Sequence, residues 1–195
     1  MKMLNVIALV FSLSLAGVGF ADSVVNMEFQ KQQQDNWCWA AVTSMIYHEN
    51  SPDGRYVWQC KMASRFIADK PGEYCCDAGV ASTSTCNRGY RTKEALDHYG
   101  LLDGYSEGRV TDATMERIRR EIGLNYPVAL STGWATGGGH AIVLYGFGFG
   151  GIAGGQAVYI YDPTTGRQVS WDDDINRYGS NGTLRGTFFT KKPGN

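Results

Sequence analysis

The sequence lacks a strong charge of either sign. Its 18 lysines and arginines nearly balance its 19 aspartates and glutamates, and the formal net charge is −1. Binding to nucleic acid or to anionic lipid needs a basic surface, so we expect no nucleic acid and no membrane surface among its partners. The 195 residues are enough for one domain with its own hydrophobic core.

Metal-binding patterns are also missing. The five cysteines form no Cys-x-x-Cys pair, and only one of the three histidines, His98, lies near the cysteine-rich stretch at residues 60–86. A structural zinc site needs four closely spaced cysteine or histidine ligands. The sequence therefore predicts no metal site, and we expect no other cofactor.

Long apolar runs are absent after the first 20 residues. Lys2 precedes an apolar stretch, Leu4–Phe20, that ends among small residues. This pattern is typical of a signal peptide, and the stretch is slightly short for a membrane span. An uncleaved membrane anchor is the alternative. We expect a bacterial signal peptide, residues 1–21, that is cleaved after Ala21 and leaves a secreted or periplasmic domain of residues 22–195.

An odd number of cysteines leaves one thiol over when the others form disulfides. Export to an oxidising compartment favours disulfides, and a leftover thiol is then a liability or a working group. The simplest partition pairs Cys60, Cys75, Cys76 and Cys86 among themselves and leaves Cys38 free. A bond between the adjacent Cys75 and Cys76 would need a strained ring. The sequence does not separate the other two pairings.

The character of the mature chain changes near residue 125. Before it, four runs predict helices, at residues 38–48, 59–69, 92–100 and 111–123. After it come short β-rich runs that are broken by glycines and turns. This order predicts an α+β fold, in which a helical part of about residues 22–124 packs against an antiparallel sheet or small barrel of about residues 125–195.

Polar residues mark the expected helix starts. Asp35 or Asn36 could cap the first helix, and Thr92 and Thr111 could cap the third and fourth. The segment of residues 71–89 has too few apolar residues to pack alone. We expect the two disulfides to hold it in place.

Cys38 lies at the predicted start of the first helix, where unpaired backbone N–H groups stabilise a thiolate. Cysteine catalysis also needs a base within reach and a group that orients the base. His48 lies ten residues further along the same helix, about 15 Å away at ~1.5 Å of rise per residue. His98 lies in a predicted surface helix. His140 instead follows three glycines and opens an apolar strand, which makes it the candidate base.

Asp162 is the candidate for the orienting group. If the strands near residues 140–149 and 156–163 pair as a hairpin, the end of the second returns to the start of the first. Asp162 then lies beside His140, and its position before a proline is also typical of a turn. Trp134 and Trp171 could shield this pair from water, although tryptophans more commonly pack in a core.

Three stretches, in this order, resemble papain-like cysteine proteases, and most closely the small secreted bacterial members and effector proteases with a Trp-Cys-Trp-Ala-Ala motif. The first two are Gln32, six residues before the cysteine, and "CWAA" at 38–41. The third is "GHAIVLYGFG" at 139–148, followed by "YDP" at 161–163. The spacing of the other four cysteines also resembles that branch.

The resemblance implies a papain-like fold and a secreted cysteine endopeptidase. Cys38 would attack the peptide carbonyl, His140 would move the proton and Asp162 would orient His140. Gln32 and the Cys38 backbone N–H would form the oxyanion hole. Because Gln33 and Gln34 follow directly, the register of that glutamine could shift by a residue or two.

The same resemblance implies a protein or peptide substrate, a monomer, and an inhibitor or immunity protein as a candidate partner. Plant-type members carry a cysteine three residues before the nucleophile and an asparagine as third group, where this chain has Asp35 and Asp162. Because only about ten residues separate the expected cleavage site from Gln32, we also expect no long inhibitory propeptide. We hypothesise that activity instead depends on disulfides that form after export.

Two other functions are compatible with these residues. One is a different acyl-transfer enzyme with a Cys–His pair, such as a peptidoglycan amidase, a deamidase or a transglutaminase-like toxin. The other is a non-catalytic, disulfide-rich binding domain in which Cys38 is buried or paired to another chain.

Overall fold

The computed structural model describes residues 23–68, 74–149, 156–171 and 175–194. The predicted signal peptide lies outside these ranges. The described helices are α1 (Cys38–Asn50), α2 (Gln59–Phe66), the 3-10 helix η1 (Tyr74–Cys76), α3 (Thr92–His98) and α4 (Asp112–Gly123). The described strands are β1 (Ser23–Val24), β2 (Leu102–Glu107), β3 (Val128–Trp134), β4 (Gly139–Phe149), β5 (Gln156–Asp162), β6 (Arg167–Trp171), β7 (Arg177–Tyr178) and β8 (Gly182–Thr190).

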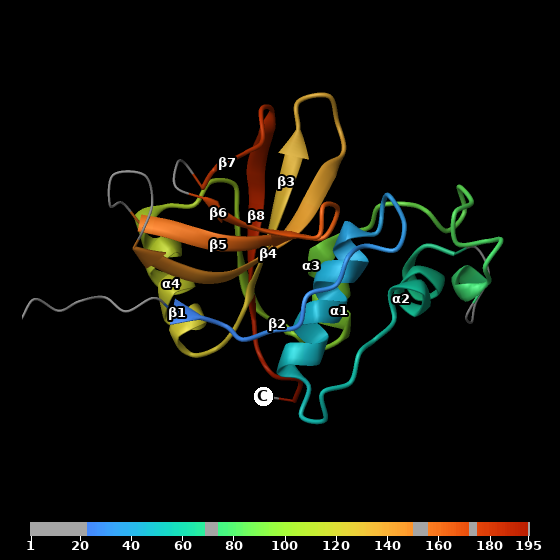
Figure 1. Cartoon of the computed structure of the whole chain (residues 1–195), viewed down its shortest axis with the longest axis horizontal. Helices are drawn as coiled ribbons and strands as arrows, with labels where there is room; N and C mark the ends of the chain where they lie inside the picture. The colour runs from blue at the N-terminus through green and yellow to red at the C-terminus, as the bar shows by residue number, and fades with distance from the viewer. Residues whose placement is uncertain (1–22, 69–73, 150–155, 172–174, 195) are drawn as a thin grey trace, which may run out of the picture.

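The strands form one antiparallel sheet in the order β2-β8-β3-β4-β5-β6, with β1 beside β4 and β7 beside β8 (Figure 1). The N-terminal helices pack against this curled half-barrel. The predicted α+β, papain-like fold is therefore confirmed. The predicted β4–β5 hairpin is also present, with Val143 opposite Tyr161.

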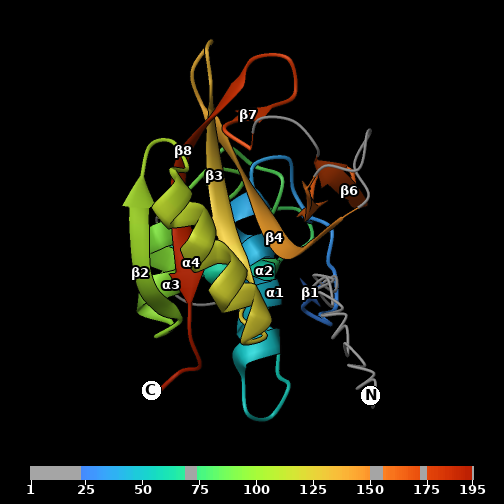
Figure 2. The same cartoon turned by 90° about the vertical axis from the view of Figure 1, so that its left-hand side faces the viewer.

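Helices lie on both sides of the sheet. Figures 1 and 2 show α1 on one side and α4 on the other. The apolar side chains of α1, α4 and the central strands belong to one core cluster. Successive side chains of a strand point to opposite faces of the sheet, so the central strands pack against both helices. Fully buried members of the cluster include Met45, Ile46, Ile118, Leu130, Ile142 and Leu144. Within the described ranges, no helix combines the length and the hydropathy that a membrane span requires.

Strand β2 corrects the expectation that residues 22–124 are helical outside their loops. It pairs with β8 along Leu102–Glu107 and forms the edge of the sheet. Its sequence, "LDGYSE", contains a glycine and two acids, which are poor strand formers. Pairing with β8 supplies the structure that the local sequence does not favour.

Of the three helix caps that the sequence predicts, the structure contains one. The Thr111 hydroxyl accepts a hydrogen bond from the Thr114 N–H at 3.3 Å, so this predicted cap is confirmed. Trp37 precedes α1 and Arg91 precedes α3, and neither gives a side-chain cap. The predictions for Asp35 or Asn36 and for Thr92 were therefore wrong. Tertiary contacts, described below, fix the start of α1 instead.

Candidate active site

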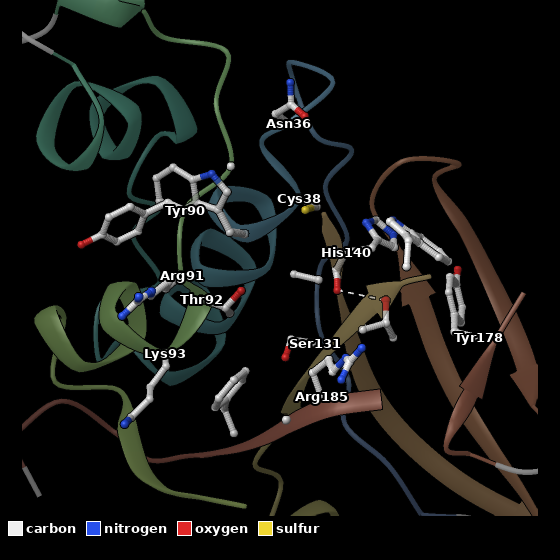
Figure 3. Close-up of a pocket in the computed structure, with 18 of the residues that line it drawn as sticks. Asn36, Cys38, Tyr90, Arg91, Thr92, Lys93, Ser131, His140, Tyr178 and Arg185 are labelled. Carbon is white, nitrogen blue, oxygen red and sulfur yellow. Dashed lines mark hydrogen bonds between the residues drawn. The ribbon is translucent and has the colours of Figure 1, made fainter. Parts of the chain in front are cut away.

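Cys38 is the first residue of α1 and has a free thiol. The first N–H groups of a helix have no acceptor within the helix, so the site around Cys38 is rich in unpaired donors. The thiol is partly exposed, and Figure 3 shows its sulfur directed toward His140. The helix start thus presents the cysteine to the sheet.

The two tryptophans beside Cys38 anchor this helix start. Trp37 and Trp39 are both about 1% exposed, and each indole N–H donates to a backbone carbonyl, that of Cys86 at 2.7 Å and that of Arg88 at 3.2 Å. Asn36 adds two hydrogen bonds to Asn87, of 2.9 and 3.0 Å. Four hydrogen bonds to residues 86–88 therefore replace the missing helix cap.

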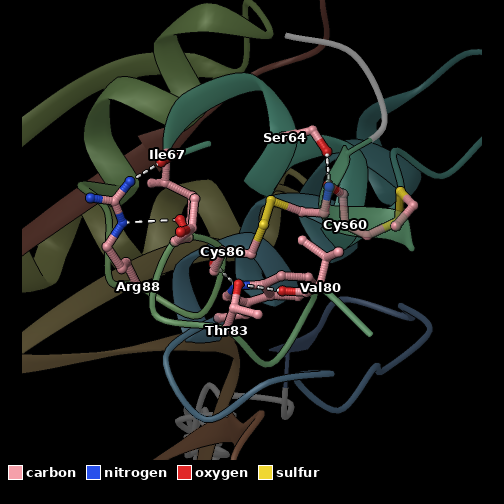
Figure 4. The surroundings of a disulfide bond; sticks show 11 residues. Cys60, Ser64, Ile67, Val80, Thr83, Cys86 and Arg88 are labelled. Carbon is pink, nitrogen blue, oxygen red and sulfur yellow. Dashed lines mark hydrogen bonds between the residues drawn. A yellow bond between two sulfur atoms is a disulfide. The ribbon is translucent and has the colours of Figure 1, made fainter. Parts of the chain in front are cut away.

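Two disulfides hold the segment that these bonds contact. Cys75 is joined to Cys86, and Cys60 is joined to Cys76, so α2, η1 and the segment at 86–88 form one unit (Figure 4). This is one of the two pairings that the sequence left open. The Ser64 hydroxyl accepts a hydrogen bond from the Cys75 N–H at 2.8 Å. The disulfides thus support the residues that position Cys38.

His140, near the start of β4, contacts Asp162, the last residue of β5. The His140 Nε2–H donates to Asp162 Oδ1 at 2.8 Å, and both side chains are about 9% exposed. The hairpin register explains the contact, because Val143 opposite Tyr161 places the end of β5 near the start of β4. With Nε2 bound to Asp162, Nδ1 is the nitrogen left for the thiol.

Two aromatic rings enclose His140. The Trp134 ring is stacked on the imidazole, with centroids 6.3 Å apart and planes at 17°. The Tyr178 ring lies 5.9 Å away on a tilted plane, and its hydroxyl donates to Asp162 Oδ2 at 2.6 Å. The shielding role considered for Trp134 fits this position, whereas the Trp171 side chain lies outside the described part of the structure.

Tyr178 is a site residue that sequence analysis missed. It belongs to a two-residue strand, β7, which pairs with the start of β8. A strand of two residues leaves no periodic pattern, so no signal in the sequence points to it. Thr164 was missed as well, and its backbone N–H donates to Asp162 Oδ1 at 2.8 Å.

These contacts shift three pKa values. Burial lowers the pKa of His140, but hydrogen bonding to Asp162 and Cys38 and the charges of both outweigh it and raise the pKa to about 9. Burial raises the pKa of Asp162, but hydrogen bonds from His140 and Tyr178 and the imidazolium charge lower it to about 2. Burial and the bond to Asp162 raise the pKa of Tyr178, so its hydroxyl remains a donor. At neutral pH, His140 and Asp162 form an ion pair.

Gln32 precedes α1 and links the segment before this helix to the segment after β5. Its Nε2 group donates to the backbone carbonyls of Gln34 at 3.0 Å and Asp35 at 2.7 Å. Its Oε1 accepts from the Thr164 hydroxyl at 2.9 Å. Both amide hydrogens are thus engaged in this structure, and the oxyanion role of Gln32 stays a prediction.

A cleft of about 940 Å³ runs over Cys38 and His140. One wall comes from the disulfide-bonded half, with Tyr90 and Thr92, and the other comes from the sheet, with Ser131 and Phe188 (Figure 3). The cleft is open to solvent and bounded by loops and strand ends. It can accept an extended chain across the thiol, which fits attack on a carbonyl that lies between the two walls.

One comparison with known proteins identifies a relationship. A family model described as "Papain-like cysteine protease AvrRpt2" matches residues 20–180, which is more than half of the chain. The matched range includes Cys38, His140 and Asp162. No curated protein matches the sequence.

Proposed function

The chain belongs to the AvrRpt2 family of papain-like cysteine proteases, and from this premise we propose that it is a secreted endopeptidase with a Cys38–His140–Asp162 triad. As a cysteine peptidase it acts on protein substrates. The observation that carries the proposal is the free thiol of Cys38 at a helix start, directed toward an imidazole that Asp162 holds from its other side.

In the first step, the Cys38 sulfur attacks the carbonyl carbon of the scissile peptide bond. The thiol proton is already on Nδ1 of His140 before the attack, and it passes from there to the leaving nitrogen. The C–N bond breaks, an amine leaves and a thioester joins the substrate to Cys38. The raised pKa of His140 suits this step, because it keeps the imidazolium available as the acid at neutral pH.

In the second step, water attacks the thioester while His140 accepts its proton. The acid product leaves, and the thiol is restored. In both steps a negative charge develops on the carbonyl oxygen, and the Cys38 backbone N–H can donate to it from the helix start. Gln32 would be the second donor. For this, one of its amide hydrogens would leave the backbone carbonyl of Gln34 or Asp35 and donate to the oxyanion instead.

Export is a separate part of the proposal. We expect the signal peptide, residues 1–21, to be cleaved after Ala21, and the two disulfides favour an oxidising compartment. Protein recovered from the periplasm or medium should begin at Asp22 when its N-terminus is sequenced. A full-length chain that stays in the membrane fraction would contradict the cleavage.

The decisive experiment is covalent capture by an epoxide inhibitor of papain-like proteases. The wild-type protein should gain the mass of one inhibitor on Cys38 and should cleave casein. Cys38→Ala should lose both properties. His140→Ala should keep the thiol but label slowly, since no base remains to take its proton.

Substrate panels separate peptidase activity from other acyl transfer. Cleavage of casein and peptides, with peptidoglycan left intact, is the expected result. Labelling of Cys38 with cleavage of peptidoglycan only would favour an amidase. Failure of iodoacetamide to label Cys38 in the native protein would overturn the enzymatic proposal.

A further inference from the structure

Arg185 occupies an irregular position on the sheet wall of the cleft. In the β3–β8 pairing, Ser131 is opposite Gly186 and Thr132 is opposite Leu184, so Arg185 is an extra residue on β8. Such a β-bulge turns a side chain away from its regular direction, and bulges occur often beside active sites. Arg185 lines the cleft and is exposed.

The bulge and a glycine direct the Arg185 side chain across β3. A Cβ atom at Gly133 would lie 2.6 Å from Arg185 Nε and 3.0 Å from its Cγ. The arginine side chain therefore packs on the backbone of Gly133, in space that the side chain of another residue would occupy. The acidic cleft residue nearest in the sheet, Glu107, pairs with Gly186 from the other side of β8. The guanidinium therefore extends away from this carboxylate.

Each of the other two cationic side chains that line the cleft has an acidic or aromatic partner, whereas no such partner contacts Arg185 in the part of the chain that the structure describes. Arg91 forms an ion pair with Glu94 at 3.0 Å, and the Lys93 Nζ lies 3.6 Å from the centre of the Tyr105 ring. Among the residues that the structure describes, no carboxylate pairs with the guanidinium of Arg185.

A second donor lies beside the guanidinium. The Ser131 side chain lies next to Gly186, the residue after Arg185, because a Cβ atom added to Gly186 would be 3.2 Å from Ser131 Oγ. Figure 3 shows Ser131 and Arg185 together in the part of the cleft below Cys38 and His140. A planar guanidinium and a hydroxyl on one wall match the oxygens of a carboxylate.

The sheet also sets the distance from this pair of donors to the reacting bond. Arg185 is on β8 next to Leu184, Leu184 is opposite Thr132 on the neighbouring β3, and Thr132 pairs with His140 on β4. Two strand spacings amount to about 10 Å, and an extended peptide rises about 3.3 Å per residue. A group bound at Arg185 is therefore two or three residues from the scissile bond.

We infer that Arg185, with the Ser131 hydroxyl, binds a carboxylate of the substrate two or three residues from the bond that is cleaved. The enzyme then selects acidic segments of its protein substrates. This inference rests on the proposed peptidase function, because it places a peptide in the cleft. The carboxylate can belong to an aspartate or glutamate side chain or to the C-terminus of a short substrate.

The test uses acetylated octapeptide mixtures in which one position is Glu or Gln and the others are randomised. Their dissociation constants are measured on the disulfide-bonded Cys38→Ala protein, with Arg185→Gln added for comparison. At one position, Glu should bind about 10- to 100-fold more tightly than Gln, as expected of a charge-assisted hydrogen bond. Arg185→Gln should reduce that ratio to about one.

The control is Arg55→Gln, which removes the same charge from a turn outside the cleft, where Arg55 pairs with Asp53. It should leave the Glu/Gln ratio unchanged. Mixtures with a free or an amidated C-terminus distinguish the two sources of the carboxylate. Equal binding of Glu and Gln mixtures at every position, or a preference that survives Arg185→Gln, would overturn the inference.

The kcat/KM values of the active protein for the same mixtures should show the same ratio at the same position. Arg185-dependent binding to Cys38→Ala without cleavage by the active protein would support the carboxylate site and refute the peptidase function. The failure of one proposal is thus separable from the failure of the other.

Discussion

Asp162 accepts three hydrogen bonds although it is almost buried. They come from His140, Tyr178 and the Thr164 backbone N–H. A buried carboxylate with several donors stays ionised, and its charge in turn stabilises the imidazolium beside it. Asp162 thus favours the protonated form of His140, although it does not itself contact the reacting atoms.

Asp162→Asn should therefore change the pH dependence of activity. The charge of Asp162 and its hydrogen bond act together with Cys38 to raise the pKa of His140 to about 9, so the loss of the Asp162 contribution should lower that pKa. We expect the alkaline limb of the kcat/KM profile to move to lower pH, and activity at neutral pH to fall about 100-fold or more.

Tyr178→Phe is the matched control for this change. It removes one donor but keeps the carboxylate, which remains charged well below neutral pH. The alkaline limb should then stay near its wild-type position. An alkaline limb that is unmoved in Asp162→Asn would contradict the role given to this ion pair.

The same pair predicts how stability varies with pH. The folded pKa of His140 lies above the usual 6.5, so its contribution is complete below pH 6.5 and is lost as pH rises through about 9. The folded pKa of Asp162 lies below 3.8, so its contribution is complete above pH 3.8 and is lost as pH falls through about 2.

Urea unfolding at pH 5.5, 7.5 and 9.5 measures the alkaline half of this dependence (~2 pH units per step). The free energy of unfolding should decrease between the last two conditions. His140→Gln should remove part of that decrease, and an identical slope in this variant would contradict the assignment to His140.

At the scale of elements, the start of α1 depends on a neighbouring segment rather than on its own cap. Trp37, Trp39 and Asn36 all bond to residues 86–88, and the bond between Cys75 and Cys86 ties that segment to η1. The next residues, Gly89 to Thr92, line the cleft. The disulfide therefore supports both Cys38, the proposed nucleophile, and one wall of the cleft.

The double variant Cys75→Ser/Cys86→Ser should be less stable by about 2–5 kcal/mol, the usual cost of losing a native disulfide in a small exported domain. Activity should fall with it, because the segment that positions Cys38 is released. Thermal unfolding and the rate of Cys38 labelling measure the two effects. Full activity in this variant would refute the hypothesis that the enzyme stays inactive in the cytoplasm because its activity depends on disulfides that form after export.

At the scale of the whole molecule, the groups of the proposed triad come from two halves of the chain, and polar contacts join these halves near the site. Gln32 provides such a contact, because it bonds to residues 34–35 before α1 and to Thr164 after β5. Its backbone N–H also donates to the Pro163 carbonyl at 2.9 Å.

Two variants distinguish the two roles considered for Gln32, which are to link the two halves of the chain and to donate a hydrogen bond to the oxyanion. Gln32→Ala should lower kcat about 100-fold with little change in KM, as expected when one oxyanion donor is lost. Thr164→Val removes only the contact to Oε1, keeps the amide donor and should lower kcat less than about tenfold. Equal losses in both variants would indicate that Gln32 acts by joining the halves.

Much of this protein is determined by local sequence. Helical runs and strand runs predicted the α+β fold, and the hairpin predicted that Asp162 returns to His140, because these features depend on periodicity and on antiparallel pairing. The odd cysteine count pointed to Cys38. Strand β2 was missed, since its glycine and acids hide a strand that exists only through β8.

The tertiary structure alone decided what supports and surrounds the reacting groups. Tyr178 reaches Asp162 from a two-residue strand, and residues 86–88 replace the cap of α1, although neither relation leaves a local pattern. The bulge at Arg185 likewise follows from the register between β3 and β8. Periodicity records which face of an element is buried, but contacts between distant segments depend on how whole elements pack, which only the folded chain defines.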